Sequence, residues 1–287
     1  MNIQASNLRN AMEQGVVMCP GAWNGLVGAA VAATGFRACY ISGGATANAS
    51  GYPDVGLITL TEMCRTIKEV SNASNLPVIV DADTGYGEIE CLARTIVEYE
   101  RNGASGMHIE DQEFPKRCGH LDGKTLVSQS VMEQKIKTAS ENKTSEEFIL
   151  IARTDARGVE GFDAAIARGS AYREAGADMI FPEGLRSEEE FAEFANQCPG
   201  LLLANMTEFG KTPHITAKQF GEMGYSLVIY PVTFQRVAMG AITRGLQQLH
   251  KEWSAEGFED QMQTRQELYD LLGYVPGEPW SFNSRLN

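Results

Sequence analysis

Short apolar runs recur along the chain, and longer segments with helical spacing of apolar residues separate them. The runs lie between residues 15 and 232 and read GVVMCPG, ACYISGG, LPVIVDAD, GMHIED, FILIARTD, ADMIFPEG, LLLANMT and LVIYPV. An unbroken apolar run is typical of a strand that is buried on both faces, as the strands of a parallel sheet are. The pattern therefore predicts eight parallel strands.

The intervening segments also carry helix boundary signals. Apolar residues have helical spacing in residues 60–74, 90–104 and 163–177, and Thr59 and Glu62 have the spacing of a capping box. Two of these segments end alike, in RNGASGMHI and REAGADMIF, which indicates a repeated strand–helix unit. Eight such units predict an α/β fold, a closed (β/α)8 barrel of the TIM type. A doubly wound dinucleotide fold is disfavoured because no GxGxxG follows the first strand.

The last part of the chain exceeds what a barrel needs. After the eighth run come two amphipathic stretches, VAMGAITRGLQQLHKEW and FEDQMQTRQELYDLLGY. We expect a catalytic barrel over residues 1–245 and a C-terminal helical extension over residues 246–287, in one structural unit, because no Pro-, Gly- or Ser-rich linker divides the chain. Apolar helix faces without a place in the barrel tend to pack on a partner subunit.

Composition narrows the functional classes. The 287 residues carry a formal net charge of −13, which argues against binding to nucleic acid or to an anionic membrane, because both attract basic patches. No apolar run approaches the roughly 20 residues of a membrane span, and the N-terminus lacks the apolar core of a signal peptide, so we expect a cytoplasmic protein. Of the six cysteines, only Cys118 lies in a polar, glycine-flanked loop, and the absence of any CxxC pair argues against a zinc site.

Acidic residues cluster where two of the strands end, which is where a barrel of this kind carries its chemistry. The third run ends in Asp81 and Asp83, which share one side of a strand, and the fourth ends in Glu110 and Asp111. Carboxylates this close repel one another unless they share a proton or a hard cation, and oxygen ligands suit Mg2+ or Mn2+. A single strand-end aspartate often caps a helix, but the cluster favours a metal site.

The other strand ends contribute polar groups that bind carboxylates or metals. They are Ser42, Gly43 and Gly44 of the second, Arg153 of the fifth, Glu183 of the sixth, and Asn205, Thr207 and Glu208 of the seventh. The loop KRCGHLDGK, residues 116–124, follows the fourth strand and combines three cations with a thiol. Cations lower the pKa of a thiol and hold anions, so the loop is a candidate lid that carries Cys118 as an acid or nucleophile. The alternative is a solvated basic loop with an incidental cysteine.

Motifs along nearly the whole chain resemble the isocitrate lyase and phosphoenolpyruvate mutase superfamily, in its methylisocitrate lyase branch. In order, the motifs are SGG, DADTGYG, EDQEFPKRCGHLDGK, ARTDA, FPEG, ANMTEFGKTP and MQTRQELY. The KRCGH element is specific to the carbon–carbon lyases of the superfamily, and the chain lacks the insertions of the longer isocitrate lyases. The resemblance implies an Mg2+-dependent oxo-acid-lyase that cleaves 2-methylisocitrate to pyruvate and succinate in propionate metabolism.

The resemblance also implies a role for each matching residue. Mg2+, or Mn2+ in its place, would be held by Asp81, Asp83 and Glu110. The catalytic residues would be Cys118, which protonates the succinate carbanion, His120 and Arg153, and we take Tyr40 as the candidate base. The substrate would contact Ser42, Gly43, Gly44, Asp54, Lys116, Gly119, Arg153, Glu183, Asn205, Thr207, Arg236 and Arg265.

The substrate stays open at one point, because the loop has Leu121 and Asp122 where one branch of methylisocitrate lyases has a different pair. Related enzymes with the same cysteine loop cleave 2,3-dimethylmalate or hydrolyse oxaloacetate. We favour a tricarboxylate because Arg236 and Arg265 supply charge for a third carboxylate. The resemblance further implies a homotetramer, a dimer of helix-swapped dimers, and from the acidic charge balance we expect no nucleic-acid or membrane partner. A non-catalytic barrel is disfavoured because the mouth keeps residues such as Cys118.

Overall fold

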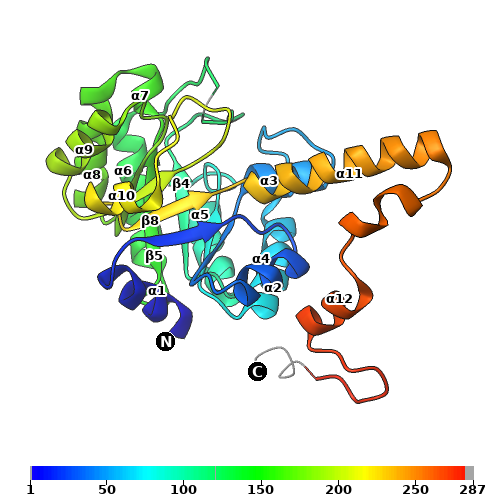
Figure 1. The fold of residues 1–287 in the computed structure, drawn as a ribbon. Coiled ribbons are helices and arrows are strands. Elements are labelled where there is room, and N and C mark those ends of the chain that lie inside the picture. The colour runs from blue at the N-terminus through cyan, green and yellow to red at the C-terminus, as the bar shows by residue number, and fades with distance from the viewer. Residues whose placement is uncertain (1, 120, 282–287) are drawn as a thin grey trace.

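The computed structural model describes residues 2–119 and 121–281 (Figure 1). In these ranges eight parallel strands form one sheet in the order β1-β8-β7-β6-β5-β4-β3-β2. The strands are β1 Val17–Pro20, β2 Cys39–Ile41, β3 Val78–Asp81, β4 Gly106–Glu110, β5 Ile149–Thr154, β6 Met179–Pro182, β7 Leu201–Asn205 and β8 Leu227–Tyr230. A parallel bridge between Gly21 and Tyr40 joins the two ends of this order. The sheet is therefore a closed (β/α)8 barrel, which confirms the prediction from the apolar runs.

The barrel has two buried layers because successive side chains of a strand point to opposite faces. In β3, Ile79 points into the barrel, whereas Val78 and Val80 pack beneath the surrounding helices. Phe181 of β6 and Leu8 of helix α1 (Ile3–Glu13) belong to the interior cluster with Ile79. Since side chains fill the interior, the loops at the strand ends are left to form a site.

Helices alternate with the strands and surround the barrel (Figure 1). After α1 they are α2 Gly25–Ala33, α3 Gly43–Ala49, α4 Leu60–Ser74, α5 Ile89–Arg101, α6 Gln129–Asn142, α7 Ala156–Val159, α8 Phe162–Glu174, α9 Glu188–Gln197, α10 Ala217–Glu222, α11 Thr233–Glu252, the 3-10 helix η1 Glu256–Gln261 and α12 Arg265–Leu272. The predicted helix at residues 60–74 is α4, and both hydrogen bonds of the capping box between Thr59 and Glu62 are present. The other two predicted helices correspond to α5 and α8.

Helix α11 projects from the barrel and runs without a break through residue 245, where we expected the extension to begin (Figure 1). Its apolar side chains Val237, Ile242 and Leu246 are exposed. Neither α11 nor any other helix in the described part of the chain combines the length and the apolarity that a membrane crossing requires.

The second amphipathic stretch, residues 258–274, is not one helix. The short η1 ends at Gln261, and Thr264 then caps α12 through its side chain. A threonine hydroxyl that accepts a hydrogen bond from the backbone marks the start of a helix, so α12 begins after its N-cap Thr264 and does not continue η1. The spacing of apolar residues did not reveal this break. Residues 282–287 of the predicted extension lie outside the described residues.

Candidate active site

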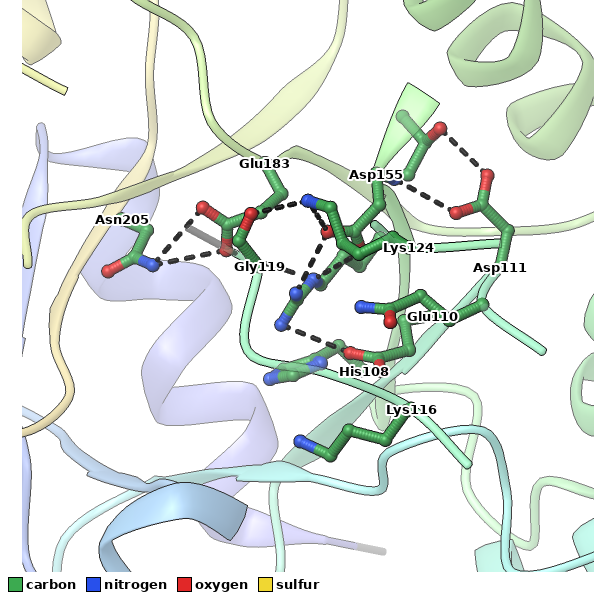
Figure 2. A network of polar contacts seen from close by, with 12 residues as sticks. His108, Glu110, Asp111, Lys116, Gly119, Lys124, Asp155, Glu183 and Asn205 are labelled. Carbon is green, nitrogen blue, oxygen red and sulfur yellow. Dashed lines mark hydrogen bonds and ion pairs between the residues drawn. The ribbon is translucent and has the colours of Figure 1, made fainter. Parts of the chain in front are cut away.

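The carboxyl ends of the strands bring ionisable side chains together at one mouth of the barrel. Asp81 ends β3, Glu110 ends β4 and Arg153 lies near the end of β5. Glu183 follows β6, and Asn205 ends β7. Figure 2 shows Glu110, Glu183 and Asn205 pointing toward the same region. Parallel strands all end on the same side of the barrel, so these residues meet although they lie far apart in the sequence.

Asp81 and Asp83 lie where β3 passes into its loop. The Asp81 Oδ2 atom accepts a hydrogen bond from the Gly43 N–H at 3.0 Å, and its Oδ1 atom accepts one from the Asp83 N–H at 3.0 Å. Burial alone would raise the pKa of Asp81, but nearby His108 and cationic side chains lower it to about 2. Burial and the neighbouring Asp81 raise the pKa of Asp83 to about 6. Asp83 also has a φ of 46°, a left-handed conformation that is unfavourable for a non-glycine residue.

Glu110 and Lys116 are buried groups of opposite charge. The Glu110 Oε2 atom forms an ion pair with Nη1 of Arg153 at 3.1 Å, and neither oxygen of the Glu110 carboxylate has a hydrogen-bond partner among the described residues. Burial raises the pKa of Glu110 well above its usual range. The Lys116 Nζ atom lies 2.6 Å from Oδ1 of Asp54 and 2.7 Å from Oδ1 of Asp83. Burial opposes the charge of Lys116, but Glu110 and Asp83 raise its pKa well above the usual range. Lys116 therefore neutralises part of the acidic cluster.

The acidic side chains fit a small divalent cation. Both carboxylate oxygens of Glu110 and Oδ1 of Asp83 are buried without a hydrogen bond within the described ranges, although Oε2 of Glu110 faces Arg153 and Oδ1 of Asp83 faces Lys116 as ion pairs. A hard cation stabilises such oxygens, and Mg2+ usually takes one or two carboxylates together with water and substrate oxygens. Within residues 2–119 and 121–281, no three His, Cys, Asp or Glu side chains converge as a complete ligand set. The predicted ligands Asp81, Asp83 and Glu110 do not form such a set among the described residues, and their role in holding a metal stays a prediction.

Arg153 forms the floor of the mouth. Its Nε and Nη2 atoms donate to the Asp155 carboxylate at 3.0 and 3.1 Å, and its Nε atom lies 3.7 Å from Oε2 of Glu183. The Asn205 Nδ2 atom donates to the same Glu183 oxygen at 3.1 Å. The guanidinium also lies over the Phe181 ring, 5.3 Å from its centroid. A planar guanidinium held in this way keeps its orientation, and its predicted contact with the substrate stays a prediction.

The loop after β4 folds back onto this floor. A Cβ atom on Gly119 would lie 2.4 Å from Nη2 of Arg153, so the loop backbone rests directly on the guanidinium and leaves no room for a side chain. Cys118 is half-buried beside it. The Lys124 Nζ atom, at the far end of the loop, donates to the carbonyl oxygen of Gly119 (Figure 2). The predicted catalytic residue His120 lies outside the described residues.

The predicted carboxylate-binding turn at Ser42, Gly43 and Gly44 is the first part of helix α3. Ser42 is the N-cap, and its side chain accepts a hydrogen bond from a backbone N–H of the first turn. The Gly43 N–H is directed at Asp81, so it holds a carboxylate of the protein itself. A Cβ atom on Gly44 would lie 3.0 Å from Oδ2 of Asp54. The structure thus places Asp54 beside Gly44, as predicted. The segment itself is the start of a helix and not a turn.

Tyr40 lies in β2, and its hydroxyl is 2.7 Å from Nε2 of His108 in β4. Burial, with a further contribution from Asp81, raises the pKa of Tyr40 well above its usual range. Burial lowers the pKa of His108 to about 4. The structure thus makes Tyr40 a hydrogen-bond partner of His108, and its role as the base stays a prediction.

Three further predicted substrate residues lie in different parts of the fold. Thr207 is buried just after β7. Arg236, in the first turn of α11, is partly exposed, and its Nη1 atom pairs with Oε2 of Glu208 at 3.0 Å. Arg265 begins α12, which contacts α2 on the outside of the barrel and buries none of its described residues. A single chain therefore leaves Arg265 outside its own mouth, and its contact with the substrate stays a prediction.

Sequence reasoning missed three side chains of the site and misplaced a fourth. His108, Lys124 and Asp155 all lie in motifs already noted, and strand alternation alone would have placed His108 on the same side of β4 as Glu110. Asp111 was grouped with the acidic cluster but points away from it. It accepts hydrogen bonds from the side chains of Thr154 and Tyr172, at 2.8 Å each, and from the N–H of Asp155 at 2.9 Å.

Comparisons with known proteins give a consistent result. The sequence model of the phosphoenolpyruvate phosphomutase family matches residues 8–250. The 2-methylisocitrate lyase of Bacillus subtilis is 48% identical over 265 residues, which cover 92% of this chain and 87% of that protein. A crystal structure of 2,3-dimethylmalate lyase superposes with a TM-score of 0.88 at 36% identity, covering 93% of this chain and 91% of that one. Phosphonopyruvate hydrolase, in complex with oxalate and Mg2+, superposes with a TM-score of 0.85 at 25% identity, covering 94% of this chain and 95% of that one.

Proposed function

The chain belongs to the isocitrate lyase and phosphoenolpyruvate mutase superfamily and is an enzyme of the methylisocitrate lyase type, and on this premise we propose that it cleaves 2-methylisocitrate to pyruvate and succinate. The proposal rests mainly on one observation: the loop that carries Cys118 contacts the mouth of the barrel, where the backbone of Gly119 lies against Arg153 and Glu183. A thiol on the residue before Gly119 would be near a carbanion formed at the floor and could protonate it.

The cofactor in this proposal is Mg2+, with Mn2+ as an alternative. Asp81, Asp83 and Glu110, all buried at the mouth, would hold the cation. When bound, it lowers the pKa of the substrate's C2 hydroxyl and neutralises the adjacent carboxylate. The Mg2+ and oxalate in the phosphonopyruvate hydrolase structure support this assignment, because oxalate is a small dicarboxylate.

The remaining chemistry belongs to side chains of the protein. Once the C2 hydroxyl has lost its proton, the electron pair of the C2–C3 bond passes to C3, and the C2 oxygen becomes the ketone of pyruvate. The Cys118 thiol then donates its proton to C3, which completes succinate and leaves a thiolate. The proton taken from the hydroxyl restores the thiol, so the cycle needs no external acid. Arg153 and Lys116, the buried cations of the mouth, would hold the substrate carboxylates and stabilise the developing charge.

Dicarboxylate substrates are the second candidate, and one contact favours them. Arg236 is already paired with Glu208, so a third substrate carboxylate would have to displace that partner. Parallel assays of 2-methylisocitrate, 2,3-dimethylmalate and oxaloacetate separate the candidates. We expect pyruvate from 2-methylisocitrate, abolished by EDTA and restored by Mg2+. Pyruvate from dimethylmalate alone, or oxalate from oxaloacetate, would transfer the assignment to the corresponding activity.

The proposed enzyme is a cytoplasmic homotetramer, a dimer of helix-swapped dimers. Support comes from α11, whose exposed apolar side chains a second copy would cover. Exchange of the C-terminal helices would also carry Arg265 to the barrel of a partner, which agrees with its place outside its own mouth. The formal net charge of −13 gives no support to a nucleic-acid partner.

A further inference from the structure

Lys124 is a buried cation to which the proposed reaction assigns no role. It lies at the end of the Cys118 loop, and its side chain is only 3% exposed. Its Nζ atom donates to Oδ1 of Asp155 at 2.7 Å and to the carbonyl oxygen of Gly119 (Figure 2). An ammonium group is taken out of water only where partners of this kind compensate for its lost hydration. The two bonds therefore define a specific docking point between the loop and the barrel.

The barrel side of this docking point is rigid. The Asp155 carboxylate also accepts hydrogen bonds from Nε and Nη2 of Arg153, at 3.0 and 3.1 Å. The Asp155 N–H donates to Oδ1 of Asp111 at 2.9 Å, and Oδ2 of Asp111 accepts from the Tyr172 hydroxyl at 2.8 Å. Both carboxylates are completely buried. Lys124 is therefore attached to the same carboxylate that orients the guanidinium of the floor.

The loop side of the docking point is the backbone around Gly119. A Cβ atom there would lie 2.4 Å from Nη2 of Arg153 and 2.5 Å from Cγ of Glu183, so the backbone is in direct contact with both side chains. The neck of the loop is closed separately, by an antiparallel bridge between Gln112 and Leu126. The two ends of the loop are therefore held together independently of the contacts that Lys124 makes.

We propose that Lys124 is a positioning residue for the reaction: through Asp155 it holds the Gly119 carbonyl, and with it the Cys118 thiol, against the floor of the site. The part of the proposal that concerns the reaction rests on the proposed function, in which Cys118 is the acid. The docking of the loop itself is measurable without any substrate.

The test uses full-length variants of Lys124 with a matched control. Lys124→Met removes the ammonium group, whereas Lys124→Arg keeps a cation that can donate to both partners. The control is Lys143→Met, because the Lys143 Nζ atom makes the same two kinds of bond, to the Phe148 carbonyl oxygen at 3.2 Å and to Oδ2 of Asp178 at 2.9 Å. Lys143 follows α6 and precedes β5, so it lies away from the mouth.

Two readouts follow the loop and the chemistry separately. The first is the rate at which iodoacetamide alkylates Cys118, measured by peptide mass spectrometry relative to the exposed Cys91. The second is the division of the effect on pyruvate formation between kcat and KM. We expect Lys124→Met to raise the relative alkylation rate of Cys118 about tenfold. It should also lower kcat about tenfold, with little change in KM. A tenfold effect is the usual size of the loss of one hydrogen bond to a charged group. Lys124→Arg should recover part of both effects, and Lys143→Met should show neither.

An unchanged alkylation rate of Cys118 in Lys124→Met would overturn the proposal, as would the same increase in Lys143→Met. Faster alkylation in a protein whose wild type releases no pyruvate from 2-methylisocitrate would support the docking role and refute the proposed function instead. If Lys124→Met fails to fold, Lys124→Gln is judged by the same two rates, because its amide still donates to Gly119 but carries no charge.

Discussion

Buried charges at the mouth neutralise one another in pairs, and the pairs contain residues that the proposed reaction needs. Arg153 lies against Glu110 and Asp155, and Lys116 lies against Asp54 and Asp83. Removing one partner of a buried pair leaves an uncompensated charge, which destabilises a protein by about 3 to 5 kcal/mol. A substitution of a charged residue here will therefore change stability and activity together, and a test of the chemistry is cleaner at an uncharged residue.

Cys118→Ser is such a test. A hydroxyl is a far weaker acid than a thiol, so we expect turnover with 2-methylisocitrate to fall by about 100-fold or more, the usual contribution of a general acid, while KM changes little. Steady-state kinetics of pyruvate release measure both quantities. Cys91→Ser, at an exposed cysteine of α5, is the control and should behave as wild type. Undiminished turnover in Cys118→Ser would remove the thiol from the reaction.

Asp155 should make the stability of the fold depend on acid pH. Burial opposes its charge, but Arg153 and Lys124 lower the pKa of Asp155 to about 2. Because the pKa is lower in the folded than in the unfolded state, the ionised carboxylate stabilises the fold above a pH of about 4, and this contribution is lost as the pH falls through 2.

Urea unfolding of Asp155→Asn and wild type checks this pH dependence. Between pH 5 and pH 3, we expect the free energy of unfolding to fall by about 1 kcal/mol more in the wild type than in the variant. Asp270→Asn, at an exposed carboxylate of α12, should follow the wild-type curve. Parallel curves for wild type and Asp155→Asn would contradict the assigned ion pairs.

Helices of this chain begin at similar capping residues but differ in what they bury. Thr59 and Thr264 each form a complete capping box, at the starts of α4 and α12. Helix α4 packs Met63, Ile67 and Val70 into the core, whereas α12 has no buried residue within the described structure. The capping box of α4 therefore contributes more to the free energy of unfolding than the capping box of α12, because tertiary packing supplies most of the stability of a helix.

Thr59→Ala should lower the free energy of unfolding by about 1 kcal/mol, the usual effect of losing an N-cap. In the dissociated single chain, Thr264→Ala should lower it less, because α12 has no buried residue there and can fray without exposing core side chains. Chemical unfolding followed by circular dichroism, at protein concentrations below those of assembly, measures both variants. An equal loss at Thr264 in the dissociated chain would contradict this difference between the two helices.

At the scale of the whole molecule, a single chain leaves an apolar helix uncovered. Val237, Ile242 and Leu246 of α11 are 63%, 50% and 61% exposed. Exposed apolar side chains gathered on one helix are typical of a surface that contacts another subunit. This feature, together with the position of Arg265 on α12, is the basis for the proposed exchange of helices between copies.

The double variant Ile242→Asp with Leu246→Asp should therefore dissociate the assembly. We expect light scattering after size exclusion to give a tetramer for the wild type and a smaller species for the variant, because charges placed in an apolar interface are strongly unfavourable. Gln247→Asp, also on the exposed surface of α11, is the control and should stay tetrameric. A monomeric wild type would refute the proposed assembly.

The sequence by itself determined the elements of the barrel and which strand ends carry ionisable side chains. Apolar runs and capping residues act over a few residues, so the strands and a helix such as 60–74 follow from local spacing. Strand ends are local as well, and Asp81, Glu110 and Arg153 lie where the runs predicted. The closure of the barrel followed from the number of repeated units.

Only the tertiary structure decided how the side chains of the site pair. Glu110 and Asp111 are neighbours in the sequence, yet one points to the mouth and the other to a hydrogen-bond network behind it. Tyr40 forms a hydrogen bond with His108, and Lys124 forms an ion pair with Asp155. The partners of each pair are far apart in the sequence, so no local sequence pattern predicts them. Partner choice and pKa depend on burial and on charges supplied by other strands, and these exist only once the barrel has closed.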